Sequence, residues 1–319
     1  MIFSWLLLFL GLLIQILYFH FDPYNNENDA LISVTNPYLS FCLIFNHKVW
    51  KFASVAIGSI IMQEPSTTFI FHIINPISDF NDNNANYRNL IVKLKNMSYD
   101  PANIKFFFYS VNESNYIFPR FKKGYPLLIM TKLYLSEFIA DKEVVYVDSD
   151  ILALRPLSSV YKYDLNPKKK PKKYFAGSST LDMFPARWIN SGFIYYNLDW
   201  LRKSGRLYSF INCTQTKAYN FYDDWCHTYC FPRKEIITLP YAYNLMIHAL
   251  KDNETRPKVI NETNDASVAH FMHRSKKALT MKLELEISNY KHASNNSKSF
   301  MRKYLNVSNI VYKFLNVSR

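Results

Sequence analysis

The sequence predicts an α/β fold with a mixed, mostly parallel β-sheet flanked by helices. Two observations lead to this prediction. Short apolar runs with strand character alternate with longer segments of helix character, which is typical of parallel sheets. One of these runs also ends abruptly on two carboxylates, at the kind of strand end where α/β proteins bind ligands. With 319 residues, 49% of them hydrophobic, the chain can bury one large core or two smaller ones.

The alternation is clearest in the first half of the chain. The predicted strands are residues 41–45, 68–74, 104–111 and 144–147, and the predicted helices are residues 50–62, a segment near residue 90, and residues 127–139. The lysine-rich stretch 167–173 is expected to be a solvated loop. After residue 281 the chain turns polar, so residues 281–319 are expected to be a weakly ordered appendage.

The amino terminus predicts a membrane segment. Residues 1–21 contain no charged side chain, and about 20 apolar residues are enough to cross a bilayer as a helix. A buried core helix and a cleaved signal peptide are the alternatives. Because no small-x-small cleavage pattern precedes Asp22, we expect an uncleaved transmembrane signal anchor followed by a short stem, residues 22–37.

Glycosylation sequons predict the compartment. Together with the anchor, they favour a single-pass type II protein of the Golgi or endoplasmic reticulum membrane, with its domain in the lumen. The sequons lie at Asn96, Asn112, Asn212, Asn253, Asn261, Asn295, Asn306 and Asn316. The net charge is +13, but no zinc-finger spacing, RNP motif or Walker loop is present, so nucleic acid is not an expected partner.

The four cysteines leave two questions open. Cys226 and Cys230 lie four apart beside His227, a spacing that zinc sites use, but no second pair of ligands has matching spacing. We therefore do not expect zinc. One disulfide is possible, and the sequence does not tell which cysteines form it.

Asp148 and Asp150 are the first candidate site residues. They end the apolar run of the segment VVYVDSDILAL, residues 144–154. Aspartate is common at such places because it initiates turns. Alternatively, two carboxylates at the end of a buried strand supply the hard oxygen ligands that Mn²⁺ or Mg²⁺ binds.

Further polar groups follow downstream. Asn190, Ser191 and Gly192 precede an apolar strand, Asp223 and Asp224 open a helical segment, and His270 follows a short apolar run with Lys276 six residues later. Taken singly, each has an ordinary explanation as a turn, a helix cap or a core histidine.

Their order along the chain resembles glycosyltransferase family 8, especially its glycogenin-like branch. The resemblance spans residues 39–279 and rests on six blocks: TKLYL, VVYVDSDILAL, NSGFIYYN, the Asp223–Asp224 pair, LPYAYN and HFMHRSKKA. It implies a GT-A, Rossmann-like fold over residues 38–280. It also implies metal-dependent, retaining transfer of a sugar, usually from a UDP-sugar.

The resemblance assigns roles to individual residues. Asp148, Asp150 and His270 are the implied ligands of Mn²⁺, with Mg²⁺ as an alternative, and the mixture of oxygen and nitrogen suits Mn²⁺. The implied catalytic residues are Asp223 and Asp224. The implied substrate-binding residues are Trp50, stacked on the uracil, Lys132 and Lys276, facing donor phosphate, and Ser149, Asn190, Ser191 and Gly192.

Departures from the family pattern keep alternatives open. Asp224 stands where the family has glutamine, His273 where it has glycine, and Lys277–Ala278 where it has Pro-Trp. A degenerate protein that binds UDP and metal without turnover therefore remains an alternative, as does a non-enzymatic membrane glycoprotein. No tyrosine occurs in residues 245–259, where glycogenin glucosylates itself. We therefore expect an external glycan or glycoprotein acceptor.

Overall fold

The computed structural model describes most of one compact unit that begins at Tyr38. The described residues are 38–80, 82–112, 127–167, 172–179, 189–215, 222–247, 250, 261, 263–271 and 295–317. The predicted anchor and stem, residues 1–37, lie outside them.

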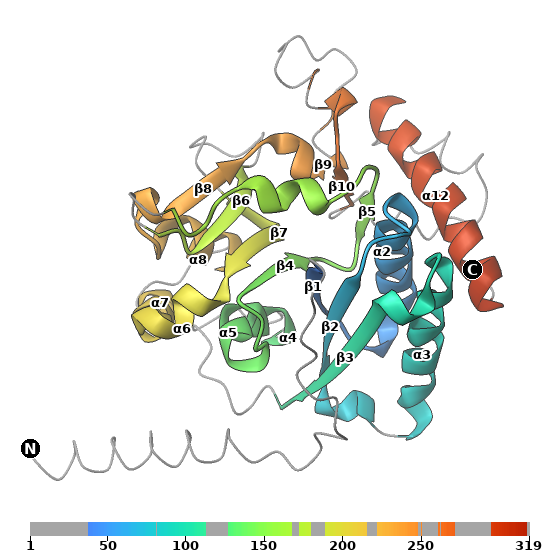
Figure 1. Ribbon diagram of the computed structural model, residues 1–319, viewed down its shortest axis with the longest axis horizontal. Coiled ribbons are helices and arrows are strands. Elements are labelled where there is room, and N and C mark those ends of the chain that lie inside the picture. Colours follow the sequence, from blue (N-terminus) through green and yellow to red (C-terminus); the bar gives the residue numbers. More distant parts are fainter. Residues whose placement is uncertain are drawn as a thin grey trace, which may run out of the picture. The chain divides into compact units, whose positions relative to one another are not determined.

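A mixed seven-stranded sheet organises this unit, with strands in the order β3-β2-β1-β4-β7-β6-β8 (Figure 1). The strands are β1 Leu39–Ile44, β2 Phe69–Pro76, β3 Ile104–Val111, β4 Glu143–Val147, β6 Phe175–Ser179, β7 Ile189–Asn197 and β8 Ile236–Leu239. Strands β1 to β4 are parallel, and β6 and β8 are parallel to each other, but β7 is antiparallel to both its neighbours. The predicted mixed, mostly parallel sheet is thus confirmed.

Alternation of side chains along the strands divides the core into two halves. In β1, Phe41 and Leu43 pack on one face of the sheet, while Cys42 and Ile44 pack on the other. Every residue of β1 and β2 is buried, as expected for strands covered on both faces.

Different helices cover the two faces. The face of Phe41 is covered by α2, Trp50–Gln63, and by the carboxyl-terminal helix α12, Asn295–Leu315, and α3, Asp82–Lys93, joins them (Figure 1). The opposite face carries five short helices. They are α4 Leu127–Met130, α5 Leu135–Phe138, α6 Leu198–Ser204, α7 Arg206–Gln215 and α8 Tyr222–Tyr229.

A small second sheet forms beside the large one. Its strands are β5 Ile151–Ala153, β10 Val268–His270 and β9 Leu245–Met246, in the order β5-β10-β9. Because β5 follows β4 after only three residues, the chain passes from one sheet into the other across Asp148, Ser149 and Asp150.

The predicted helix over residues 127–139 is interrupted. The segment folds as α4, a 3-10 turn over Thr131–Tyr134, and α5, which ends at Phe138. This break places Lys132 in the 3-10 turn, where its side chain is buried.

The expectation of a weakly ordered carboxyl terminus requires correction. Helix α12 buries one apolar face, and Val311 packs so closely on Gly58 of α2 that a Cβ at Gly58 would lie 2.7 Å from it. Tyr304 contacts Phe271, the residue after β10, at a ring separation of 5.1 Å. The tail looked polar because the other face of this amphipathic helix is exposed.

The expected localisation in the Golgi or endoplasmic reticulum membrane is also corrected. Within the described residues, no helix combines the length and the apolar character that crossing a bilayer requires. The longest of them, α12, has 21 residues but carries lysine, arginine and asparagine along its sequence.

One disulfide joins Cys213 of α7 to Cys230, just after α8. Cys230 is thereby committed to a bond with another cysteine, and His227 contacts the hydroxyl of Tyr196 at 2.5 Å.

We predict that Tyr304→Ala lowers the free energy of unfolding by about 3–5 kcal/mol, because it removes a buried aromatic ring from the contact between α12 and Phe271, the residue after β10. Urea denaturation measures the change. Asn309→Ala, on the exposed face of the same helix, is the control and should change stability by less than about 0.5 kcal/mol. Equal stability of the two variants would show that α12 does not support the domain.

Candidate functional site

The turn between β4 and β5 brings two carboxylates to the junction of the two sheets. The backbone holds this turn from both sides. Asp148 donates its N–H to the carbonyl of Gly192, and Phe271 donates its N–H to the carbonyl of Asp150, both at 2.9 Å. Strand β7 therefore supports one end of the turn, and the segment after β10 supports the other.

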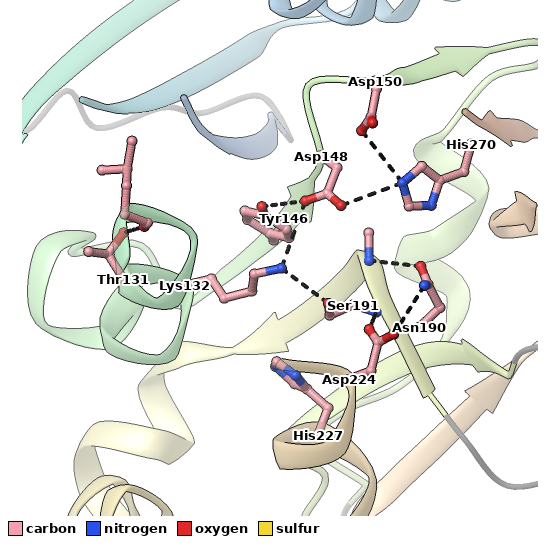
Figure 2. Close-up of polar contacts among 12 residues, drawn as sticks. Thr131, Lys132, Tyr146, Asp148, Asp150, Asn190, Ser191, Asp224, His227 and His270 are labelled. Carbon is pink, nitrogen blue, oxygen red and sulfur yellow. Dashed lines mark hydrogen bonds and ion pairs between the residues drawn. The ribbon is translucent and has the colours of Figure 1, made fainter. Parts of the chain in front are cut away.

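His270 completes a cluster with these carboxylates (Figure 2). Its Nε2 lies 3.5 Å from Asp148 Oδ2 and 3.5 Å from Asp150 Oδ1. One ligand atom from each residue lies within 4.8 Å of the other two. The Asp148 side chain is the most accessible, at 26% exposure, so the cluster opens to solvent on that side. The structure thus brings together the three residues that the sequence suggested as metal ligands.

The residues of this cluster have shifted pKa values. Burial lowers the pKa of His270, but the hydrogen bonds and negative charges of Asp148 and Asp150 outweigh burial and raise it to about 9. Burial raises the pKa of Asp148, but the nearby Lys132 and His270 lower it overall. At neutral pH the cluster is therefore an imidazolium between carboxylates, and a cation bound by the same three residues would have to displace the imidazolium proton.

The ammonium of Lys132 lies under the Asp148 carboxylate. Its Nζ donates to Ser191 Oγ at 3.1 Å, lies 3.8 Å from Asp148 Oδ1, and sits 4.6 Å from the centre of the Tyr146 ring. Tyr146 donates its hydroxyl to the same Asp148 oxygen at 2.5 Å. The buried lysine is thus compensated by a carboxylate, a hydroxyl and an aromatic face.

Asp224 reaches across from α8 to the beginning of β7. Its Oδ1 accepts the N–H of Ser191 at 2.6 Å, and its Oδ2 accepts from Asn190 Nδ2 at 3.4 Å (Figure 2). The carboxylate therefore holds the Asn190–Ser191 turn. Helix capping was one alternative from the sequence, but α8 begins two residues earlier, at Tyr222.

Gly192 is required by the position of His270. A Cβ at Gly192 would lie 2.1 Å from His270 Cε1 and 2.6 Å from Nδ1, which no real side chain tolerates. The absence of a side chain thus lets the imidazole rest against β7. The backbone N–H of Gly192 donates to Asn190 Oδ1 at 3.0 Å.

Asn244 belongs to this network although it was not among the predicted site residues. Its Oδ1 lies 2.9 Å from His270 Nδ1, and its Nδ2 donates to Asn190 Oδ1 at 2.7 Å. The signal in the sequence was the LPYAYN block, which ends on this residue. Asparagine is also common in turns, so only the three-dimensional contacts reveal that Asn244 belongs to this network.

The remaining predicted site residues are less closely connected to the cluster of Asp148, Asp150 and His270. Ser149 is buried within the turn, and Trp50 is half-buried at the start of α2, where it packs against the core. The backbone of Asp223 belongs to α8, but its side chain is outside the described part of the chain. Lys276, with residues 272–294, lies outside the described residues.

The comparisons with known proteins identify the family. The profile of "Glycosyl transferase family 8" matches residues 38–277, about three quarters of the chain. The chain belongs to glycosyltransferase family 8. No curated protein matches it significantly.

Solved structures share its fold. The bifunctional glycosyltransferase WbbM has a TM-score of 0.64 and 14% identity, with 90% of this chain but only 53% of WbbM covered. An active-site mutant of LgtC, with glutamate in place of glutamine, has a TM-score of 0.63 and 16% identity, with 85% of this chain and 96% of LgtC covered. The galactosyltransferase LgtC in complex with donor and acceptor sugar analogues has a TM-score of 0.59 and 17% identity, with 85% of this chain and 96% of LgtC covered. These likenesses establish a GT-A-like fold for this family 8 glycosyltransferase.

We predict that Gly192→Ala weakens Mn²⁺ binding about 10-fold or more, because the new methyl group displaces His270 from the two carboxylates. Electron paramagnetic resonance of free Mn²⁺ during a titration measures this affinity.

The His270→Ala background supplies the control. There the imidazole is gone and the methyl group has room, so adding Gly192→Ala should weaken Mn²⁺ binding no further. Additive losses in the double variant would contradict the steric account.

Proposed function

We propose that this family 8 glycosyltransferase transfers a sugar, with retention of anomeric configuration, from a UDP-sugar to an external glycan or glycoprotein acceptor with the help of Mn²⁺. The observation that supports it best is the meeting of Asp148, Asp150 and His270 at the carboxyl end of β4. A site at this end of an α/β sheet is where ligands generally bind.

The three side chains fit a divalent cation. Neighbouring ligands of an octahedral ion with bonds of about 2.1 Å lie about 3 Å apart. The distances of 3.5 Å from His270 Nε2 to each carboxylate are close to this spacing. Two carboxylate oxygens with one imidazole nitrogen suit Mn²⁺, with Mg²⁺ as an alternative. The bound ion supplies a Lewis acid that offsets charge on a diphosphate.

The chain's own residues then account for binding and orientation. We assign Lys132 and Lys276 to electrostatic attraction of the donor phosphates, and Trp50 to stacking on the uracil. Asn190, Ser191, Gly192 and Ser149 line the turns that would face the donor. In the reaction, the bond from the anomeric carbon to phosphate oxygen breaks, and a bond to the acceptor oxygen forms on the same face. The departing UDP keeps the electron pair of the broken bond, and the proton of the acceptor hydroxyl passes to its phosphate oxygen.

Asp223 and Asp224 are the proposed catalytic carboxylates. As the donor bond breaks, positive charge develops at the anomeric carbon, and a carboxylate nearby stabilises it. Asp224 accepts the Ser191 N–H at 2.6 Å, which fixes its carboxylate beside the turn that begins β7. The same contact holds the turn that would bind the donor sugar, so Asp224 has an orienting role as well.

Asp150→Asn tests the function directly. It keeps the side-chain shape but removes a charge from the cation site, so we expect Mn²⁺-dependent turnover of a UDP-sugar to fall about 100-fold or more. The assay is release of UDP from a panel of UDP-sugars, with and without acceptor glycans. Asp199→Asn, a partly exposed aspartate paired with Lys203, is the matched control and should keep full activity.

If wild-type protein releases UDP from no donor in the panel although it binds Mn²⁺ and UDP, the alternative of a non-catalytic UDP- and metal-binding protein holds. If it binds neither ligand, the proposal fails.

A second prediction concerns Asp224→Asn. The Asn190 amide cannot turn to suit the new amide, because its Oδ1 already accepts from Gly192 N–H and Asn244 Nδ2. Two NH₂ groups would then oppose each other where Asp224 now accepts from Asn190. We expect turnover to fall about 100-fold, from lost charge and a displaced turn. Steady-state kinetics measure it, and an unchanged rate with an unchanged donor Michaelis constant would remove Asp224 from the mechanism.

A further inference from the structure

Asn244 occupies the space between the proposed cation ligands and the turn that begins β7. It follows the 3-10 turn Tyr241–Tyr243, immediately before β9, and only 1% of its surface is exposed. Both ends of its side-chain amide are engaged, one with His270 and the other with Asn190. A buried amide with a hydrogen bond at each end couples the orientation of His270 to that of Asn190.

The chemistry of the neighbours fixes the direction of these hydrogen bonds. The backbone N–H of Gly192 can only donate, so the atom of Asn190 that receives it at 3.0 Å is the carbonyl oxygen. The Asn244 atom 2.7 Å from that oxygen must be a donor, and therefore is the NH₂ group. The same NH₂ group lies 3.4 Å from the backbone carbonyl of Asn190, which also only accepts.

The other end of the amide then dictates the state of His270. Because the NH₂ group of Asn244 faces Asn190, its oxygen faces His270 Nδ1 at 2.9 Å, and Nδ1 must carry a proton. In the neutral imidazole this leaves the lone pair on Nε2, the nitrogen that faces Asp148 and Asp150. That tautomer is the one a cation between the carboxylates needs.

We propose that Asn244 is a positioning residue that sets the tautomer of His270 for cation binding and, through the same amide, the orientation of Asn190 toward the donor sugar. The inference rests on the proposed function and deepens it, since it makes cation affinity and sugar recognition depend on one side chain. Asn244 contacts His270 through Nδ1, whereas Nε2 is the nitrogen that faces the two carboxylates.

Two substitutions separate the two halves of this role. Asn244→Leu has similar volume and makes neither hydrogen bond. Asn244→Asp still accepts the proton of His270 Nδ1 but cannot donate to Asn190, whose oxygens would then face a carboxylate. Asn197→Leu is the matched control: Asn197 is equally buried and caps α6 through the N–H of Trp200, so its loss removes a buried amide elsewhere.

The first measurement is the dissociation constant of Mn²⁺ alone, from paramagnetic resonance, without nucleotide. We expect Asn244→Leu to raise it about 10- to 100-fold, as loss of a group that orients a metal-bound histidine generally does. Asn244→Asp and Asn197→Leu should stay within about 3-fold of wild type. Circular dichroism shows whether each variant is folded. If Asn244→Leu is not folded, the measurements on Asn244→Asp still test the role of Asn244.

The second measurement is the ratio of the affinities for UDP-sugar and for UDP, at saturating Mn²⁺. Asn244→Asp should reduce this ratio about 10-fold, because Asn190 loses its orientation while the diphosphate site is kept. Equal loss of Mn²⁺ affinity in the Leu and Asp variants would overturn the tautomer assignment, and an unchanged ratio in the Asp variant would overturn the link to Asn190.

These outcomes are distinct from failure of the proposed function. A wild-type protein that binds Mn²⁺ but transfers no sugar would overturn the function and leave the contrast in Mn²⁺ affinity measurable. A wild-type protein that binds no Mn²⁺ would overturn both.

Discussion

The contact of one buried imidazole with two carboxylates organises this molecule. Asp148 and Asp150 lie on the turn that joins the large sheet to the small one, and His270 ends the central strand of the small sheet. Attraction between them offsets the cost of burying three titratable groups, which would be high for any of them alone. The same contact ties the middle of the chain to its last described strand, so it links the two sheets.

Several features of the fold follow from the need to place His270 against Asp148 and Asp150. Gly192 lacks a side chain where the imidazole must lie, and β7, which carries it, also receives the hydrogen bond of Asp148. Helix α12 packs through Tyr304 on Phe271, beside the histidine. Helix α12 thus supports the residue next to His270, the proposed cation ligand, and packing of this kind keeps the geometry of a site fixed.

The sequence was most informative where periodicity and motif agree. The four strands before Asp148 fall within two residues of their predicted ends, because buried parallel strands are recognisable as continuous apolar runs. The order of Asp148, Asn190, Asp224 and His270 indicated a common site. Periodicity could not show that Asp224 faces β7, or that Asn244 joins His270 to Asn190, since these depend on contacts between distant elements. The tail was misjudged because half of α12 is polar, and composition alone does not distinguish an amphipathic helix from a disordered segment.

Charge in the cluster predicts an order of binding for the proposed cation and nucleotide. At neutral pH, Lys132 and the imidazolium of His270 balance the two carboxylates Asp148 and Asp150, so these four side chains together are neutral before any ligand arrives. A divalent cation that displaces the histidine proton replaces one positive charge by two and leaves the group with a net charge of one. In the proposed function, this positive charge is what would attract the donor diphosphate. On the proposed function, we therefore expect the cation to bind before the nucleotide. Lys132 is buried 3.8 Å from Asp148 and contributes to the charge balance before any ligand binds.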